Sequence, residues 1–114
     1  MLKPLRGDVW SLDLKPTRGH EQAGKRPGLV LSENTFNIGP AGLVVVLPIT
    51  TKHKGIPLHV GIDPQESGLK VKSFIKCEDI RSVSKLRFFS RLGAVDDGVM
   101  RKVEANVKIL LGIF

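Results

Sequence analysis

The spacing of apolar residues changes once along this chain, and that change limits the folds open to it. Residues 8–14 alternate between apolar and polar, which is typical of a half-buried strand. Residues 29–31 and 43–49 are short continuous apolar runs bounded by Gly and Pro, as expected of strands buried on both faces. Only after Asp96 does the spacing lengthen to that of a helix.

Shorter segments complete the strand pattern. Alternation predicts strands at residues 58–62 and 69–72, and a further short strand is expected at residues 80–83. The alternation slips at residues 73–75, which indicates a bulge. Residues 32–37 are expected to form one helical turn. Two segments rich in turn-forming residues are expected to be hairpin loops, at residues 37–40 and 63–68.

The last segment predicts the single long helix. Its apolar residues recur every three or four positions, at Val99, Val103, Val107, Leu110 and Phe114. Asp96 and Asp97 precede this stripe as candidate N-caps. Several short strands followed by one helix predict a mainly β fold, a small SH3-like barrel or half-barrel capped by the C-terminal helix, as one domain over residues 1–114.

The cysteine count and the lengths of the apolar runs indicate where such a chain resides. Cys77 is the only cysteine, so no internal disulfide can form, which favours a reducing compartment. The longest apolar run, residues 43–47, is far too short to cross a bilayer, and residues 1–10 contain no apolar leader. We therefore expect a soluble cytoplasmic protein without a membrane partner.

The charge of the chain favours a polyanionic partner. Eighteen Lys and Arg against eleven Asp and Glu give a net charge of +7. Residues 70–91 hold seven cations and two anions, and residues 15–26 hold four cations and one anion. If the two segments meet in space, they form the electrostatic footprint of a nucleic-acid site. The alternative is that these side chains coat ordinary solvated faces.

The sequence predicts neither a metal site nor a cofactor site. His20, His53 and His59 are far apart in sequence, and one cysteine cannot complete the usual zinc set. The glycines at residues 19–24 match neither the dinucleotide fingerprint nor a P-loop. His59 is expected on the outward face of its strand without a special role. Chemistry that needs no metal and no cofactor is the hypothesis to test.

Residues 16–27 form a turn-prone loop whose side chains suit phosphate chemistry. RNA carries its own nucleophile, the 2′-hydroxyl, so a protein that cleaves it supplies only proton transfer and charge stabilisation around one phosphate. Arg26 offers a planar cation, and Thr50 offers a hydroxyl at the end of an apolar run. His20 is the best general acid or base by residue type.

Each of these side chains also has a plainer interpretation. Arg26 can simply pair with Glu21, and threonine is common at strand ends, as Thr50 is. His20 in a polar loop is usually solvated. Cys77 is expected to be a small core residue rather than a nucleophile.

Four motifs together resemble the PemK/MazF endoribonuclease toxins of bacterial toxin–antitoxin pairs. They are Gly-Asp-Val-Trp at residues 7–10, Pro-Thr-Arg-Gly-His-Glu-Gln at 16–22, Lys-Arg-Pro at 25–27 and Leu-Pro-Ile-Thr-Thr at 47–51. The resemblance implies a PemK/CcdB-type barrel that cuts single-stranded RNA at short sequences without a metal. The products implied are a 2′,3′-cyclic phosphate or 3′-phosphate and a 5′-hydroxyl. A homodimer and an acidic antitoxin, with a tail that folds across the basic groove, are also implied.

The resemblance further assigns roles to individual residues. It makes Arg26 and Thr50 the catalytic pair and His20 a catalytic or RNA-binding residue. A branch of the family has Arg-Cys-Asp-Gln where this chain has Lys-Cys-Glu-Asp at residues 76–79, which makes Glu78 a further catalytic candidate. The RNA-binding residues expected are Arg18, Glu21, Gln22, Lys25, Thr51, Lys52, Lys76, Asp79 and Arg81.

Two other functions fit the same fold. One is a non-enzymatic toxin that binds and poisons a protein such as DNA gyrase, and the other is a basic barrel that binds nucleic acid without cutting it. Fold alone does not separate these functions. The catalytic set does, because a gyrase binder has no need of Arg26 and Thr50 together beneath a histidine-bearing loop.

Overall fold

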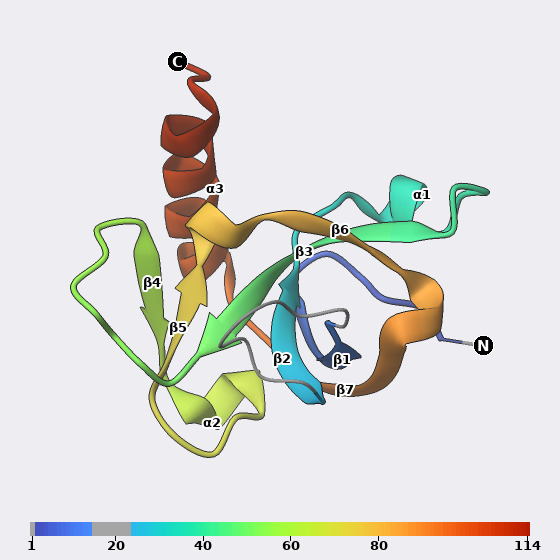
Figure 1. The fold of residues 1–114 in the computed structure, drawn as a ribbon, viewed down its shortest axis with the longest axis horizontal. Helices are drawn as coiled ribbons and strands as arrows, with labels where there is room; N and C mark the ends of the chain where they lie inside the picture. The colour runs from blue at the N-terminus through green and yellow to red at the C-terminus, as the bar shows by residue number, and fades with distance from the viewer. Residues whose placement is uncertain (1, 15–23) are drawn as a thin grey trace.

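The computed structural model describes residues 2–14 and 24–114, and its strands are arranged around one long strand, β3 (Figure 1). The strands are β1 (Asp8–Asp13), β2 (Lys25–Val30), β3 (Leu43–Thr50), β4 (His59–Ile62), β5 (Ser73–Lys76), β6 (Arg81–Ser84) and β7 (Phe88–Ala94). The α-helices are α1 (Asn34–Asn37), α2 (Pro64–Ser67) and α3 (Asp97–Leu111), and the 3-10 turns are η1 (Cys77–Asp79) and η2 (Lys85–Arg87).

Every strand pairing in the described chain is antiparallel, in the order β4-β5-β3-β2-β1-β7, with β6 also on β3. One edge of β3 pairs with β2, while the other edge is shared by two strands. The first half of β3 pairs with β6, from Leu43 to Val46, and its end pairs with β5, at Ile49 and Thr50. The short turn η1 links β5 to β6 and so sits beside the middle of β3.

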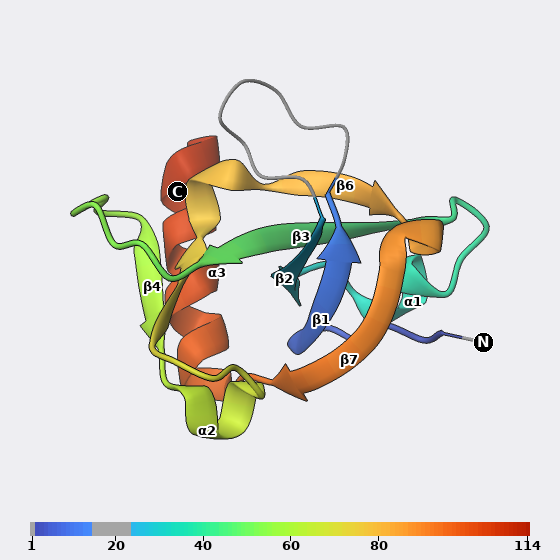
Figure 2. The same cartoon turned by 60° about the horizontal axis from the view of Figure 1, so that its bottom comes forward.

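The two faces of β3 pack against different cores. Val44 and Val46 face a cluster that five strands surround, and its other buried members are Trp10, Leu12, Val30, Val83 and Phe88. Leu47 and Ile49 face a second cluster that includes residues of α3, which lies behind the β5 end of β3 in Figure 2. The strands therefore curl into a half-barrel, with the C-terminal helix covering one side. This confirms the predicted mainly β fold with a C-terminal helix.

Helix α3 begins and ends where its sequence allows. The Asp96 side chain accepts a hydrogen bond from the Val99 N–H at 2.8 Å, which confirms Asp96 as the N-cap. Gly112 takes a left-handed conformation with φ of 71° and closes the helix. The predicted apolar stripe is correct for Val103 and Val107, which are buried, whereas Leu110 and Phe114 are exposed. The stripe was wrong beyond Val107 because no described element covers that end of the helix.

Three local predictions were wrong. Residues 69–72 are not a strand, because Leu69 packs on the core beside α2 while Val71 is exposed, and β5 starts only at Ser73. The expected bulge at residues 73–75 is absent from the β4–β5 pairing, which keeps one register, and the register shifts fall between β1 and β7 instead. Strand β7 was missed because residues 89–92 are all exposed and show no alternation.

Candidate active site

Arg26 and Thr50 lie on neighbouring strands, β2 and β3. The pairing of β2 with β3 ends at Gly28 and Pro48, and the same register carried two residues further sets Arg26 across from Thr50. Opposite residues on paired strands point to the same face with Cβ atoms about 5 Å apart. Both residues are half-buried. The fold therefore places a guanidinium and a hydroxyl at one end of β3, as the proposed catalytic pair requires.

The Thr50 hydroxyl is already oriented by the backbone. Its Oγ1 accepts a hydrogen bond from the Lys52 N–H at 3.1 Å, in a tight turn that ends β3. Because the oxygen is held as an acceptor, its own proton is available to donate outward. The next two residues, Thr51 and Lys52, are exposed, so solvent or a polyanion can reach this turn.

The cations near β3 differ in whether they are already paired. The Asp79 carboxylate accepts hydrogen bonds from Arg81 at 2.7 Å and from Lys76 at 3.5 Å, and about a third of each side chain is exposed. The guanidinium of Arg26 has no hydrogen-bond or ion-pair partner among residues 2–14 and 24–114. Lys25 lies with its Nζ 4.3 Å from the centre of the Phe89 ring. Within these residues Arg26 is thus a guanidinium free to meet a phosphate.

Glu78 binds a histidine that the sequence did not single out. His59 Nε2 and Glu78 Oε2 are 2.9 Å apart, and only 2% of the His59 side chain is exposed. The expectation that His59 faces outward was wrong, because its ring is buried against the Glu78 carboxylate of η1. Glu78 Oε1 and His59 Nδ1 are buried and have no hydrogen-bond partner in the part of the chain that the structure describes.

The structure also places an aromatic pair beside this site. The His53 ring stacks on the Phe74 ring, with centroids 4.4 Å apart and planes inclined by 16°. Phe74 lies directly across from Thr50 in the pairing of β5 with β3. The sequence offered no signal for this contact, since it depends on residues 51–58 folding back over β5.

Cys77 is buried in the cluster beneath α3, which confirms the prediction of a small core residue. Burial, and then the neighbouring Glu78 charge, raise the pKa of its thiol from 9.0 to about 11. The thiol is therefore protonated at neutral pH and cannot act as a nucleophile there.

Four of the candidates, Arg18, His20, Glu21 and Gln22, lie outside the described residues. In the rest of the chain, no group of three or more His, Cys, Asp or Glu side chains is placed to hold a metal ion. Over that same part, no helix is long and apolar enough to span a membrane.

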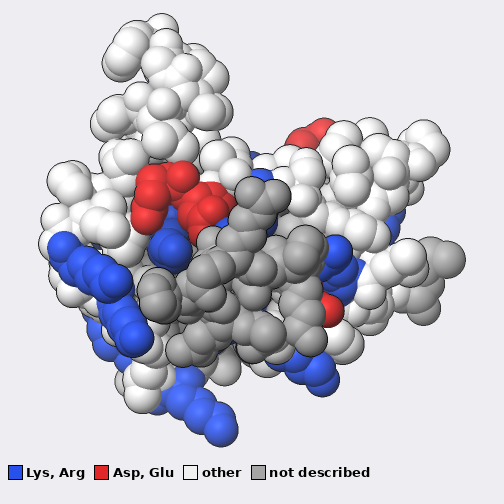
Figure 3. All heavy atoms as spheres, in the orientation of Figure 1, with Lys and Arg blue, Asp and Glu red and all other residues white. Residues whose placement is uncertain are grey.

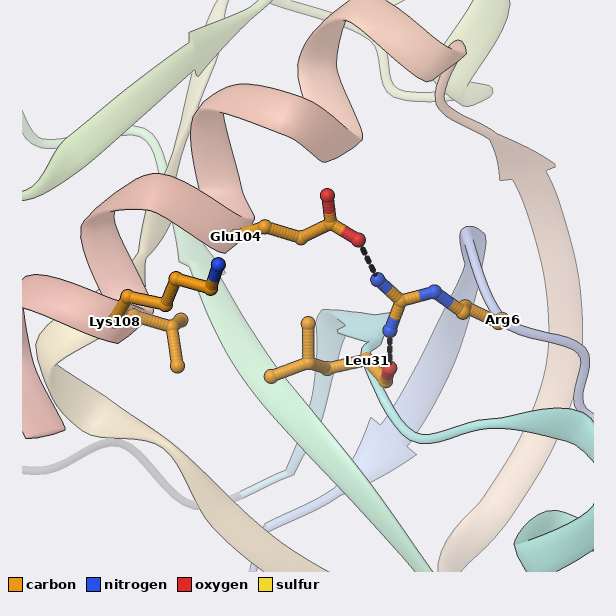
Figure 4. A pocket seen from close by; sticks show the side chains of 5 residues that line it. Arg6, Leu31, Glu104 and Lys108 are labelled. Carbon is orange, nitrogen blue, oxygen red and sulfur yellow. Dashed lines mark hydrogen bonds and ion pairs between the residues drawn. The ribbon is translucent and has the colours of Figure 1, made fainter. Parts of the chain in front are cut away.

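Basic side chains are widely spread on one face of the molecule. In Figure 3, Lys and Arg side chains lie at the left, the bottom and the right, and the acidic side chains form one cluster at the upper left with smaller patches at the upper right and the right. A separate pocket lies between α3 and the chain before β1, and Arg6 bridges it by binding Glu104 and the Leu31 carbonyl oxygen (Figure 4). Arg26, Thr50 and Glu78 do not line this pocket.

Comparison with known proteins agrees with this architecture. Residues 5–111 match the family described as PemK-like, MazF-like toxin of type II toxin-antitoxin system. Endoribonuclease EndoA of Bacillus subtilis (strain 168) is 35% identical over 109 residues, covering 95% of this chain and 94% of the relative.

Solved structures give the same result. A crystal structure of MazF from Deinococcus radiodurans superposes with a TM-score of 0.84 at 32% identity, covering 98% of this chain and 99% of that one. An endoribonuclease in complex with its cognate antitoxin, from a mycobacterial species, gives a TM-score of 0.77 at 28% identity, covering 100% and 98%. The chain belongs to the PemK-like, MazF-like toxin family of type II toxin–antitoxin systems.

Proposed function

We propose that this protein is an endoribonuclease toxin that cuts single-stranded RNA at a short sequence, without a metal ion. The observation that carries the proposal is the placement of Arg26, with its guanidinium unpaired among the described residues, across from the oriented hydroxyl of Thr50. Its relative from Bacillus subtilis is named an endoribonuclease. The same likeness favours RNA cleavage over the poisoning of gyrase and over binding without cleavage.

In the proposed reaction, the 2′-oxygen of one nucleotide attacks the adjacent phosphorus and the 5′-oxygen of the next nucleotide leaves. The Arg26 guanidinium grips the non-bridging oxygens and stabilises the charge that develops on the phosphorane. Thr50 donates its hydroxyl proton to the same phosphate and so orients it. The products are a 2′,3′-cyclic phosphate and a 5′-hydroxyl, and water opens the cyclic product to a 3′-phosphate.

In this proposal His20 takes the proton from the attacking 2′-hydroxyl, and the leaving 5′-oxygen takes up a proton from water. Glu78 is poorly placed to take the 2′-hydroxyl proton, because Oε2 is held by His59 and Oε1 is buried away from solvent. A histidine has the unperturbed pKa best matched to moving a proton near neutral pH. Glu78 then acts only through the contact that holds the His59 ring in place.

The decisive experiment uses purified protein, excess EDTA and a long natural RNA. The cut sites are mapped first, and an oligonucleotide spanning one site is then compared with the same oligonucleotide carrying a single 2′-deoxy nucleotide at the cut. Cleavage in EDTA that the single deoxy substitution abolishes supports the mechanism. Activity that disappears on chelation and returns with Mg²⁺, or cleavage of the deoxy substrate, contradicts it.

The proposal includes an acidic antitoxin and a homodimer in the cytoplasm, where RNA is available and an unpaired thiol such as Cys77 is stable. A mycobacterial relative is described in complex with its cognate antitoxin, and the net charge of +7 suits an acidic partner. An acidic tail that shares the RNA surface should block cleavage at near-stoichiometric amounts. Light scattering measures the mass of the active species, and cell fractionation locates it. Full activity as a monomer would contradict the dimer.

A further inference from the structure

The stacked pair of His53 and Phe74 is not part of either hydrophobic core. On β5, Ile75 joins the cluster beneath α3, so Phe74 points to the opposite, half-exposed face. His53 is exposed although its ring stacks on Phe74 and lies 6.0 Å from the tilted His59 ring, so part of the His53 side chain stays accessible to a ligand. Because this aromatic contact lies at the surface and not in a core, it is a candidate binding surface.

The position of the pair relative to Thr50 suggests that it binds a nucleotide next to the cut phosphate. Phe74 is the direct partner of Thr50 on one side and of Gly61 on the other, since β5 lies between β3 and β4 (Figure 1). Thr50 and Phe74 are paired, and the register of β2 on β3, carried two residues beyond Gly28 and Pro48, adds Arg26 to the same row. A phosphate held by Arg26 and Thr50 would have its neighbouring nucleotide at Phe74.

A lysine side chain passes beside Phe74, over the glycine opposite it. A Cβ atom on Gly61 would lie 3.2 Å from Lys72 Cε and 3.3 Å from Lys72 Nζ, and at the ordinary contact distance of 3.5 Å from Phe74 Cε1, so the bare backbone of Gly61 leaves room for Lys72. The flanking residues Lys52 and Lys54 are both exposed, which places a positive charge on either side of His53 along the chain. Exposed cations beside an aromatic surface are the usual pattern of single-stranded nucleic-acid binding.

We propose that His53, supported from below by Phe74, is a stacking platform for the RNA base next to the cut phosphate. This inference rests on the proposed function and adds a nucleotide-binding subsite to it. Unpaired RNA bases stack on aromatic and histidine rings, and such contacts tolerate any base because every base has a π face. The platform therefore fixes the position of the RNA strand over Arg26 and Thr50, and other contacts determine which RNA sequence is cut.

The test measures cleavage kinetics of an RNA oligonucleotide that the wild-type protein cuts. His53→Ala should raise KM about 5- to 150-fold, the range expected for losing one stacked base, while kcat changes far less. His53→Phe should restore KM and His53→Lys should not, because an RNA base stacks on an aromatic ring and not on a lysine ammonium group. Phe74→Leu should give part of the His53→Ala defect by removing the ring that supports His53.

A direct readout complements the kinetics. In the uncleavable oligonucleotide with a single 2′-deoxy nucleotide at the cut, 2-aminopurine is placed in turn on each side of the mapped cut, and its fluorescence is compared for the wild-type and His53→Ala proteins. Quenching at one position that is lost in His53→Ala supports the platform.

Two results would overturn the platform while the proposed function stands. They are an unchanged KM in His53→Ala, and rescue by His53→Lys but not by His53→Phe. If the wild-type protein does not cut RNA at all, the proposed function itself is contradicted. That result is distinct from a failure of the platform in a protein that does cut RNA.

Discussion

Replacing Arg26 by alanine tests the central feature of the site. The guanidinium makes no hydrogen bond or ion pair with any described residue and stands half-buried at the open end of β2. Its loss should therefore change the free energy of unfolding by less than about 1 kcal/mol. Turnover should fall about 100- to 1,000-fold, which corresponds to removing one preorganised group that stabilises developing charge. Arg26→Lys should recover little, because an ammonium cannot grip two phosphate oxygens at once.

The position of Thr50 extends this test to a double-mutant cycle. Thr50→Val keeps the branched shape and removes the hydroxyl that the Lys52 N–H orients. If both groups bind the same phosphate, the double variant should lose less activity than the product of the two single losses. Cleavage in EDTA and thermal unfolding are measured on each variant, with Arg101→Ala on the exposed side of α3 as the matched control. An Arg26→Ala protein that cuts as fast as wild type would refute the assignment.

Two further predictions concern the scaffold. Gly68 has φ of 76° and a Cβ there would lie 1.8 Å from the Leu92 carbonyl oxygen, so Gly68→Ala should cost at least about 2 kcal/mol of unfolding free energy, measured by denaturant titration. Gly55→Ala, with φ of 68° and nothing within 4 Å, is the control and should cost clearly less. Because the folded pKa of Cys77 is raised from 9.0 to about 11, the unfolded chain loses this proton first as pH rises. Wild type should therefore lose more stability than Cys77→Ala between those two values, and equal losses would contradict the pKa shift.

The sequence predicted the elements whose burial follows a regular period. β1, β3 and α3 each bury one face or both faces against a core, so the spacing of their apolar residues records the structure. β7 was missed for the opposite reason, because residues 89–92 are exposed and its pairing with β1 is made by backbone atoms. Backbone pairing of this kind leaves no pattern in the side chains.

The residues of the candidate site were likewise predicted from the sequence only in part. The identity of Arg26 and Thr50 came from family resemblance, and the register between β2 and β3 now supplies their proximity. The His59–Glu78 and His53–Phe74 contacts join residues about 20 positions apart through the turn η1 and the segment after β3. Such contacts depend on how a non-periodic segment folds back, which local spacing does not encode.

Two variants identify the residue that carries the proton. Glu78→Gln preserves the shape of the side chain and can still accept a hydrogen bond from His59, so the fold and the contact with His59 should persist. If Glu78 only positions, Glu78→Gln should retain most of the turnover. His20→Ala should lower turnover about 100-fold and remove one limb of the pH–rate profile near neutrality.

The opposite result would assign the proton transfer to Glu78 and not to His20. A large loss in Glu78→Gln, with His20→Ala near wild type and an unchanged pH profile, would make Glu78 the base despite its buried Oε1. That outcome would require the His59–Glu78 pair to open when RNA binds, because the oxygen must reach the 2′-hydroxyl to within hydrogen-bond distance. His59→Phe then separates the two cases. It would raise activity if the pair restrains a base, and it would leave activity unchanged or lower if Glu78 only holds the His59 ring in place.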